Sequence, residues 1–357
     1  MCMDMLKTIS KLSHAYGTAE YVKAGGGNTS CKDAETLWIK PSGTTLAGLK
    51  PETFVMMDRT ELSRLYEAVT PVDSADREAL VKNIMASAVK AGTSGRPSVE
   101  APLHDSLSAR YVVHTHPPIV NGMTCAADGR AAVARLFPDA LWVPYIDPGY
   151  MLCMSVRRSI HTYKAAHGVE PRLIFLQNHG VFVSGDTEAE IRGTYTRVFD
   201  TLKKAYRTCG VAAEVCVCES PSDAQVRGWR QVLSEALGEH AAAVAVSGRF
   251  EVGNGPISPD HIVYAKSYAY EGGVSVGELL AFVSARGYTP RVIVTENAVL
   301  GVGTNTKTAR LALELALDGA LVKQLAYAFG GLCYLSDVSR LFIENWEVES
   351  YRAKQAV

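Results

Sequence analysis

Three histidines and one glutamate combine residue types that bind metal ions and transfer protons. His114 and His116 stand two residues apart at the end of an apolar run. In a β-strand, the side chains of residues i and i+2 point to the same face, so both imidazoles can reach one ion. His179 ends a second apolar run, and Glu100 precedes the first. A third imidazole from a neighbouring strand would leave one coordination position open, as in catalytic rather than structural zinc sites.

The ligand type narrows the choice of ion. Neutral imidazole favours zinc among the common ions, although manganese, cobalt and iron also bind to it. A lone histidine is usually a satisfied core or turn residue, but these three stand at the ends of two apolar runs, each beside a turn residue. We therefore expect a divalent metal centre. The other histidines fit no such pair and are assigned to surfaces or packing: His14, His104, His161, His167, His240 and His261.

Glu100 allows two interpretations, because it precedes a helix expected over residues 102–109. A glutamate at this position is most often a charge that the positive end of the helix dipole favours. Beside a metal ion, it would instead bind the ion at rest and act as a base once substrate displaces it. Burial would raise the pKa of the carboxyl and the ion would lower it, and the sequence does not decide between them. His104, four residues later, is an alternative candidate for a position behind the metal ligands.

Three polar turns could hold an anion with neutral donors. They are the glycine-rich residues 25–30, residues 40–45 and the segment that contains Ser98. Such loops are often only turns, but glycines let main-chain amides crowd around an anion, and Asn28 and Thr29 add donors. The formal net charge is −1, so an anionic ligand has to be held by a local site of this kind.

Composition bounds the class of protein. A chain of 357 residues is long for one core, and 47% apolar with 20% charged residues is ordinary for globular domains. The basic residues are dispersed, so nothing favours nucleic acid or a membrane surface as partner. No apolar run reaches membrane-spanning length and the first residues lack signal-peptide features, from which we expect a cytosolic protein with eight reduced cysteines. Cys216 and Cys218 could ligate metal, but their spacing is wrong for a zinc ribbon.

Helical and extended patterns alternate along the first 210 residues. We expect helices over 5–23, 76–91, 102–109, 119–125, 155–167 and 187–209, and extended segments over 37–39, 54–57, 110–116, 141–145 and 172–183. This alternation predicts a layered α/β fold in which helices cover a central sheet.

The pattern loosens after residue 210, and we place a boundary between a catalytic domain of residues 1–215 and a smaller α/β domain of residues 216–357. In the second domain, Ser220 should cap a helix that begins at Pro221. Strands are expected over 261–264 and 290–294, and helices over 276–286, 307–328 and 339–354.

Five ordered motifs carry a family resemblance: Gly27-Asn-Thr-Ser30, Pro41-Ser-Gly-Thr44, Pro97-Ser-Val-Glu100, Val112-Val-His-Thr-His-Pro117 and Gln177-Asn-His-Gly180. Over about residues 5–210, the chain resembles the class II aldolase/adducin family. The resemblance implies a layered α/β/α domain with a zinc site at His114, His116 and His179. It also makes Glu100 the catalytic acid or base. The phosphate of a sugar-phosphate substrate would bind at Gly27, Asn28, Thr29, Ser42, Gly43 and Ser98.

Further expectations follow from the same resemblance. Family enzymes are commonly homotetramers in which a tyrosine at the subunit interface protonates the leaving aldehyde. Tyr145 is the candidate, with Tyr150 behind it, and the alternative is that both are core or interface aromatics. The chain departs from the aldolases at Val99, where these often carry a second serine. The C-terminal domain is similar to segments of longer chains that join a rhamnulose-1-phosphate aldolase part to a short-chain dehydrogenase.

The expected reaction is cleavage of a ketose 1-phosphate, of rhamnulose or fuculose type, into dihydroxyacetone phosphate and an aldehyde. A sugar-phosphate 4-epimerase, a dehydratase or a decarboxylase could use the same site, because each passes through a carbanion-like species beside a bound metal ion. A non-catalytic, adducin-like interaction domain is the third possibility. Gly301-Val-Gly303 follows a strand but lacks the third glycine of a dinucleotide-binding turn, so nucleotide binding is not expected.

Overall fold

The chain forms two compact units. The computed structural model describes residues 2–93 and 95–346. The first unit comprises the residues up to 120 together with 130–201, and the second comprises 121–129 together with the residues from 202 onward. This division falls within helix α8 (Glu188–Thr208), whereas the predicted boundary at residue 215 falls between α8 and α9 (Asp223–Leu237). The boundary at residue 215 stays a prediction.

The first unit is built on a seven-stranded sheet with the order β3-β2-β1-β4-β7-β6-β5. Neighbouring strands are antiparallel except for the parallel pair β5 and β6. The bounds are β1 Asn28–Lys32, β2 Thr36–Ile39, β3 Val55–Asp58, β4 Tyr111–Thr115, β5 Leu141–Val143, β6 Leu173–Leu176 and β7 Gly180–Gly185. The strands β4 and β7, which carry or adjoin the three histidines, therefore lie at the centre of the sheet.

Strand β1 corrects the sequence analysis, which treated residues 25–30 as a glycine-rich turn. The turn ends at Gly27, and Asn28 begins a strand that pairs with both β2 and β4. Its residues are polar except for Cys31, yet all five are buried. A central position in the sheet satisfies the backbone on both sides, and this context outweighs the low β-propensity of the residues.

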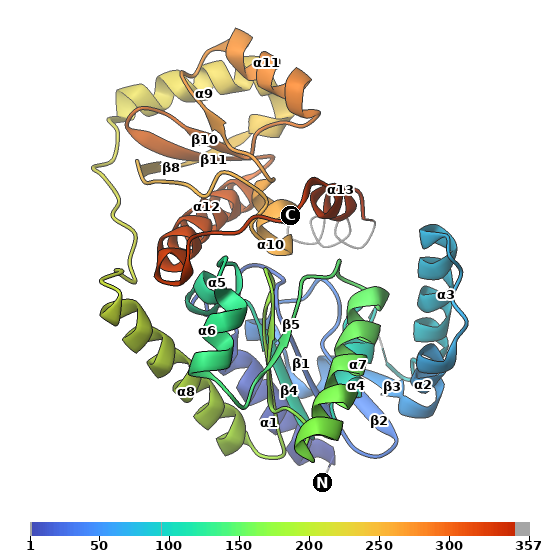
Figure 1. The fold of residues 1–357 in the computed structure, drawn as a ribbon. Coiled ribbons are helices and arrows are strands. Elements are labelled where there is room, and N and C mark those ends of the chain that lie inside the picture. Colours follow the sequence, from blue (N-terminus) through green and yellow to red (C-terminus); the bar gives the residue numbers. More distant parts are fainter. Residues whose placement is uncertain (1, 94, 347–357) are drawn as a thin grey trace. The chain divides into compact units, whose positions relative to one another are not determined.

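Helices cover both faces of this sheet. On one face, α4 (Ala101–Ser106) and α7 (Tyr150–His167) pack against the sheet through a cluster that includes Leu103, Val156 and Phe182. On the other face lie α1 (Cys2–Tyr16) and the first part of α8, as Figure 1 shows. The remaining helices are α2 Arg59–Glu67, α3 Ser74–Ser87, α5 Pro118–Thr124 and α6 Gly129–Leu136, with 3₁₀ turns at Leu46–Gly48 and Pro51–Thr53. The predicted α/β/α layering is confirmed.

The second unit is a smaller α/β layer. Its four-stranded sheet has the order β8-β11-β10-β9, antiparallel except between β10 and β9. Helix α12 lies close against β11. The core of the unit consists mainly of leucines, valines and alanines from the sheet and from α9 and α11. The bounds are β8 Ala243–Gly248, β9 Tyr270–Glu271, β10 Val292–Val294, β11 Ala298–Gly303, α10 Pro259–Ala265, α11 Val276–Arg286, α12 Thr306–Ala326 and α13 Asp337–Asn345, with 3₁₀ turns at Gly238–Ala241 and Tyr327–Phe329.

Two predictions in this unit are wrong and one is cut short. Residues 261–264 belong to helix α10, because Pro259 at its first turn and Ser258 before it start a helix there. Helix α9 is capped by Ser222, whose side chain accepts from the N–H of Gln225, and not by Ser220. Helix α13 ends at Asn345, and residues 347–354 of the predicted terminal helix lie outside the described residues. Among the described residues, no helix has the length and apolar character that crossing a bilayer requires.

Candidate active site

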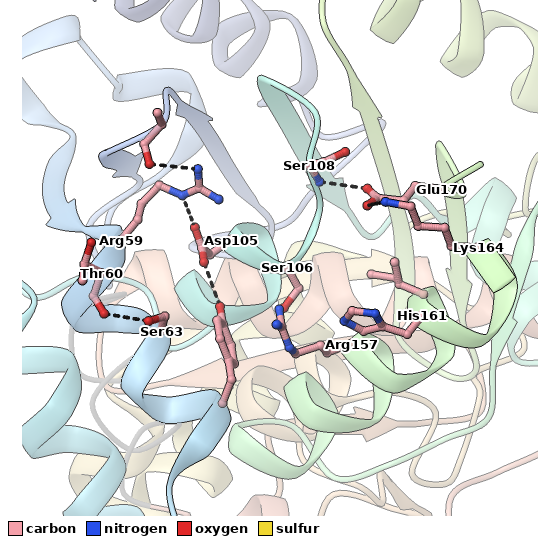
Figure 2. A pocket seen from close by; sticks show the side chains of 13 residues that line it. Arg59, Thr60, Ser63, Asp105, Ser106, Ser108, Arg157, His161, Lys164 and Glu170 are labelled. Atoms are coloured by element: carbon pink, nitrogen blue, oxygen red, sulfur yellow. Dashed lines mark hydrogen bonds and ion pairs between the residues drawn. The ribbon is translucent and has the colours of Figure 1, made fainter. Parts of the chain in front are cut away.

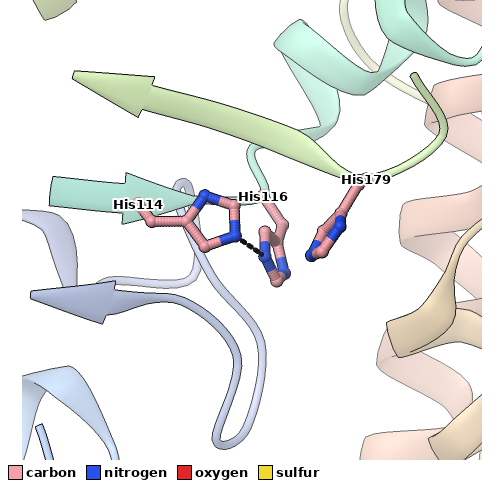
Figure 3. Close-up of side chains that lie close together, drawn as sticks. All are labelled: His114, His116 and His179. Atoms are coloured by element: carbon pink, nitrogen blue, oxygen red, sulfur yellow. Dashed lines mark hydrogen bonds between the residues drawn. The ribbon is translucent and has the colours of Figure 1, made fainter. Parts of the chain in front are cut away.

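The structure brings together the three histidines that the sequence singled out. His114 lies in β4, His116 follows the end of that strand, and His179 lies in the turn between β6 and β7. One ligand atom of each ring lies within 4.8 Å of those of the other two. The Nε2 atoms of His114 and His116 are 2.9 Å apart. Figure 3 shows the three rings turned toward one another at the ends of their strands.

Close backbone packing holds this cluster together. Gly180 begins β7 directly after His179, and a Cβ atom there would lie 2.7 Å from Cδ2 of His116 and closer still to the carbonyl oxygen of Thr115. Only glycine therefore lets β7 approach the end of β4 so closely. Asn178 has a φ of 51°, a left-handed conformation that asparagine tolerates better than most residues, and it turns the chain toward His179.

His114 has the environment of a metal ligand. Its Nδ1 atom lies 3.0 Å from the carbonyl oxygen of Val181, which fixes a tautomer that donates from Nδ1 and leaves the Nε2 lone pair facing the cluster. The ring stacks on Phe182 with the centroids 3.8 Å apart. Burial lowers the pKa of His114 more than the nearby Glu100 raises it, so the net pKa lies below its ordinary value. Three imidazoles whose nitrogen atoms lie within 4.8 Å of one another fit a divalent transition metal ion.

Glu100 is the carboxylate of this site. It stands at the N-cap position of α4, but its side chain makes no capping hydrogen bond. Its Oε1 atom lies 3.4 Å from Nε2 of His114 and 3.6 Å from Nε2 of His179. Burial raises the pKa of Glu100, but the two histidines lower it more, and the net pKa lies well below its ordinary value. The group is therefore an ionised carboxylate turned toward the histidines.

Strand β1 supports this carboxylate from behind. Alternate side chains on one face of β1 reach the α4 segment in turn. The amide of Asn28 donates to Oε2 of Glu100, and the hydroxyl of Ser30 lies 2.8 Å from Nδ1 of His104. The ammonium of Lys32 donates to the carbonyls that follow α4, those of Leu107 at 2.7 Å and Ala109 at 3.0 Å. His104 is fully buried and therefore does not lie on the surface. Its place next to Glu100 agrees with the alternative prediction, a position behind the metal ligands.

Backbone hydrogen bonds connect the three polar segments that were predicted to bind phosphate. The N–H of Lys40 donates to the carbonyl of Thr29 at 3.1 Å, and the N–H of Ser98 donates to the carbonyl of Lys40 at 3.2 Å. The N–H of Ser42 donates to the carbonyl of Arg96 at 2.8 Å. Segments that lie far apart in the chain thus form one surface next to Glu100, whose own N–H donates to Oγ of Ser98 at 3.2 Å.

Two glycines and one lysine complete these segments. Gly27 and Gly43 have φ values of 70° and 81°, which favour glycine. A Cβ atom on Gly27 would also lie 2.7 Å from the carbonyl oxygen of His114. Lys40 is not among the predicted phosphate-binding residues, but its side chain is buried, with the ammonium 3.3 Å from the carbonyl of Gly25. It places a cation among the predicted phosphate-binding residues.

The remaining candidates lie elsewhere. The hydroxyl of Thr29 is 2.7 Å from that of Ser13 on α1, so it points away from the face that carries Asn28. Tyr145 follows β5, and its N–H donates to Oε1 of Gln177 at 3.1 Å, next to the turn that carries His179. Tyr150 is buried and donates to the carbonyl of Leu65 at 3.2 Å, as expected of a core aromatic.

The layered unit and this cluster define a candidate metal-dependent enzyme. A family model described as the class II aldolase and adducin N-terminal domain matches residues 7–206, more than half of the chain. The chain therefore belongs to the class II aldolase and adducin family, and the resemblance drawn from its motifs is confirmed. Class II aldolases use a divalent metal ion, and the three-histidine cluster is a site that could hold one.

Three individual proteins that the chain matches each share less than 30% sequence identity with it. The chain is 28% identical over 173 residues to the uncharacterized oxidoreductase YuxG of Bacillus subtilis (strain 168), and the match covers 46% of this chain and 24% of YuxG. Among solved structures it is similar to the N-terminal class II aldolase domain of a conserved protein from Thermoplasma acidophilum, with 20% identity, a TM-score of 0.48 and coverage of 56% of this chain and 92% of that one. It is also similar to L-fuculose-1-phosphate aldolase from Thermus thermophilus, with 17% identity, a TM-score of 0.39 and coverage of 58% and 97%.

Proposed function

We propose that this chain is a zinc-dependent aldehyde-lyase that cleaves a ketose 1-phosphate, of rhamnulose or fuculose type, into dihydroxyacetone phosphate and an aldehyde. The observation that carries the proposal is the convergence of three imidazoles and the ionised Glu100 at one point of an α/β/α unit. His114, His116 and His179 would hold the ion. When bound, a divalent ion supplies Lewis-acid stabilisation of the negative charge that carbon–carbon cleavage leaves on the substrate, worth several kcal/mol.

Glu100 is the group that moves the proton at carbon. In the synthetic direction its carboxylate removes a proton from the hydroxymethyl carbon of dihydroxyacetone phosphate. In the cleavage direction Glu100 first takes up a proton from solvent and, as the carboxylic acid, delivers it to the same carbon, while the proton that leaves the substrate hydroxyl is released to solvent through Tyr145, so the proton count balances over the cycle. Asn28, which donates to Oε2, holds the carboxylate so that Oε1 stays turned toward His114 and His179.

Two further groups complete the mechanism. Tyr145 takes the proton of the substrate hydroxyl in cleavage and hands it to the aldehyde oxygen in synthesis. The phosphate is held by the connected polar segments, where Lys40 adds a positive charge and Thr29 contributes by accepting the N–H of Lys40. Holding the phosphate fixes the scissile bond relative to Glu100, which is catalysis by positioning. In this scheme Gly27, Asn28, Ser42, Gly43 and Ser98 bind the phosphate, and Thr29 supports them only through its carbonyl, because its hydroxyl pairs with Ser13 on the other face.

The test is a Glu100→Gln variant loaded with zinc and assayed for triose phosphate release from a panel of ketose 1-phosphates. Removing a general acid or base costs about 10²–10⁴-fold in turnover. We expect a loss in this range with zinc content unchanged. Glu52→Gln, at an exposed position outside the site, is the matched control and should keep full activity. Turnover of Glu100→Gln equal to that of the control would refute the role of Glu100.

Product analysis distinguishes the alternatives that use the same residues. A 4-epimerase, a dehydratase or a decarboxylase would convert its substrate without releasing dihydroxyacetone phosphate. A non-catalytic adducin-like domain would have no need for the histidine cluster, so a purified protein that takes up no divalent metal would favour that alternative.

The proposal extends to a cytoplasmic homotetramer in which Tyr145 acts close to a subunit interface. Light scattering after size-exclusion chromatography measures the assembly directly. A monomer with full activity would argue against an interface role for Tyr145.

A further inference from the structure

A second pocket lies in the first unit, and none of its lining residues belongs to the histidine cluster. Its volume is about 470 Å³, within the range of about 300–1,000 Å³ that is typical of small-molecule sites. Residues from α2, the end of α4 and the middle of α7 surround it. Figure 2 shows its polar side chains. The pocket is lined by three basic residues, two acidic residues and one histidine: Arg59, Arg157, Lys164, Asp105, Glu170 and His161.

Both acidic residues are already neutralised. Asp105 accepts from Nε of Arg59 at 2.5 Å and from the hydroxyl of Tyr66 at 3.0 Å. On the other side of the pocket, Glu170 accepts from Nζ of Lys164 and from the N–H of Ser108. These two pairs leave no carboxylate free to neutralise a third cation.

Arg157 is that third cation. Its guanidinium lies 3.9 Å from the centroid of the Tyr66 ring, and among the described residues no carboxylate pairs with it. The aromatic face holds the guanidinium in place, and its N–H groups donate to none of the described residues. His161 follows one helical turn later on α7, is exposed, and makes no ion pair with any described residue. Arg157 and His161 therefore present unused donors to the same pocket.

We propose that this pocket binds the oxyanion of a small metabolite, a phosphate or a carboxylate, on Arg157 and His161. A guanidinium held over an aromatic ring keeps its planar fork of donors available for two oxygens of one anion. The Arg59–Asp105 and Lys164–Glu170 pairs bound the pocket on either side and keep its net charge positive without consuming Arg157. The remaining volume accommodates the body of the metabolite, and the lining hydroxyls are suited to a polar one.

The test is isothermal titration of the zinc-loaded full chain with inorganic phosphate and, separately, with succinate. The two probes distinguish a phosphate from a carboxylate ligand. Arg157→Gln removes the fork, and Arg158→Gln is the matched control, because Arg158 is exposed on the same helix and does not line the pocket. A charge-assisted hydrogen bond contributes about tenfold or more in affinity. We expect Arg157→Gln to weaken binding of at least one probe by that factor, while Arg158→Gln stays within about twofold.

Two further variants keep the experiment decisive. Ser42→Ala identifies any phosphate bound at the proposed active site, since that binding should respond to Ser42 and not to Arg157. His161→Asn changes an exposed residue and should weaken binding even if Arg157→Gln fails to fold. Equal affinities for wild type, Arg157→Gln and His161→Asn would overturn the proposal. It would also be overturned if neither probe bound, or if only Ser42→Ala weakened binding.

Discussion

Gly180→Ala is the change that tests most directly whether packing between β4 and β7 forms the histidine cluster. The added Cβ atom would lie 2.7 Å from Cδ2 of His116 and closer to the carbonyl oxygen of Thr115, whereas real Cβ contacts essentially never fall under 3.0 Å. The ring of His116 must move by at least 0.3 Å to restore that limit, and the two strands must also separate, because the carbonyl oxygen of Thr115 would lie still closer to the added atom. Neither response leaves the three imidazoles where they are.

The expected magnitudes follow from these two responses. Forcing an extra methyl group into a packed site costs about 1–3 kcal/mol of stability. Displacing the support of a metal ligand lowers metal affinity by about 10–100-fold. We expect Gly180→Ala to show both effects, because the carbonyl of Thr115 belongs to the sheet and the ring of His116 belongs to the cluster.

Two assays measure these effects separately. Zinc affinity is measured by competition with a fluorescent chelator, and stability by urea unfolding of the metal-free protein. Gly193→Ala is the matched control, because this exposed glycine lies within α8 and an added Cβ atom meets nothing within 4 Å. The control should gain about 0.5–1 kcal/mol of stability and keep its zinc affinity. If Gly180→Ala matches wild type in both assays, the close approach does not hold the cluster together.

Three further predictions concern residues outside the metal cluster. Burial lowers the pKa of Lys32 from 10.5 to about 7, so between these pH values the unfolded chain binds more protons than the native one. The stability of wild type relative to Lys32→Met should therefore rise by about 1.4 kcal/mol per pH unit from about pH 7.5 to about pH 9.5, and a difference in urea stability that is independent of pH would contradict this. Gly301→Ala should destabilise the second unit by about 1–3 kcal/mol, because the Cβ atom would meet the backbone carbonyl of Ala309 on α12; an unchanged urea transition would refute it. Tyr195→Phe should cost about 1–3 kcal/mol by leaving the buried hydroxyl of Thr115 without its 2.7 Å partner, and Thr115→Val in the same chain should recover part of the loss in urea unfolding.

The sequence predicted those elements of the first unit whose burial is reflected in apolar side chains. The strands over residues 37–39 and 54–57 and the helix over residues 155–167 are recognisable because their apolar residues face a core. The short helix α2 is not recognisable in the same way, because its only buried residues, Leu62 and Leu65, are surrounded by polar and charged ones.

Helix α10 shows why a local propensity can mislead. The residues Ile262 and Val263 are β-branched and favour a strand on their own. Ser258 and Pro259, which precede these residues, are typical of a helix N-terminus, and they correctly predict the helix that begins at Pro259. In a segment of seven residues, the backbone requirement at the first turn decides more than the preference of two side chains.

The residues that support Glu100 could not be predicted, because strand β1 is not recognisable in the sequence. The rule that residues i and i+2 share a face identified His114 and His116, and applied to β1 it would have placed Asn28, Ser30 and Lys32 on one face as well. The sequence does not mark β1 as a strand, because this segment has no apolar alternation and follows three glycines. The contacts of these three residues with Glu100, His104 and the end of α4 join positions more than 70 residues apart, so only recognition of the strand could have indicated them. The metal ligands can be predicted from local spacing, whereas the groups that hold the carboxylate depend on which strands are neighbours in the sheet.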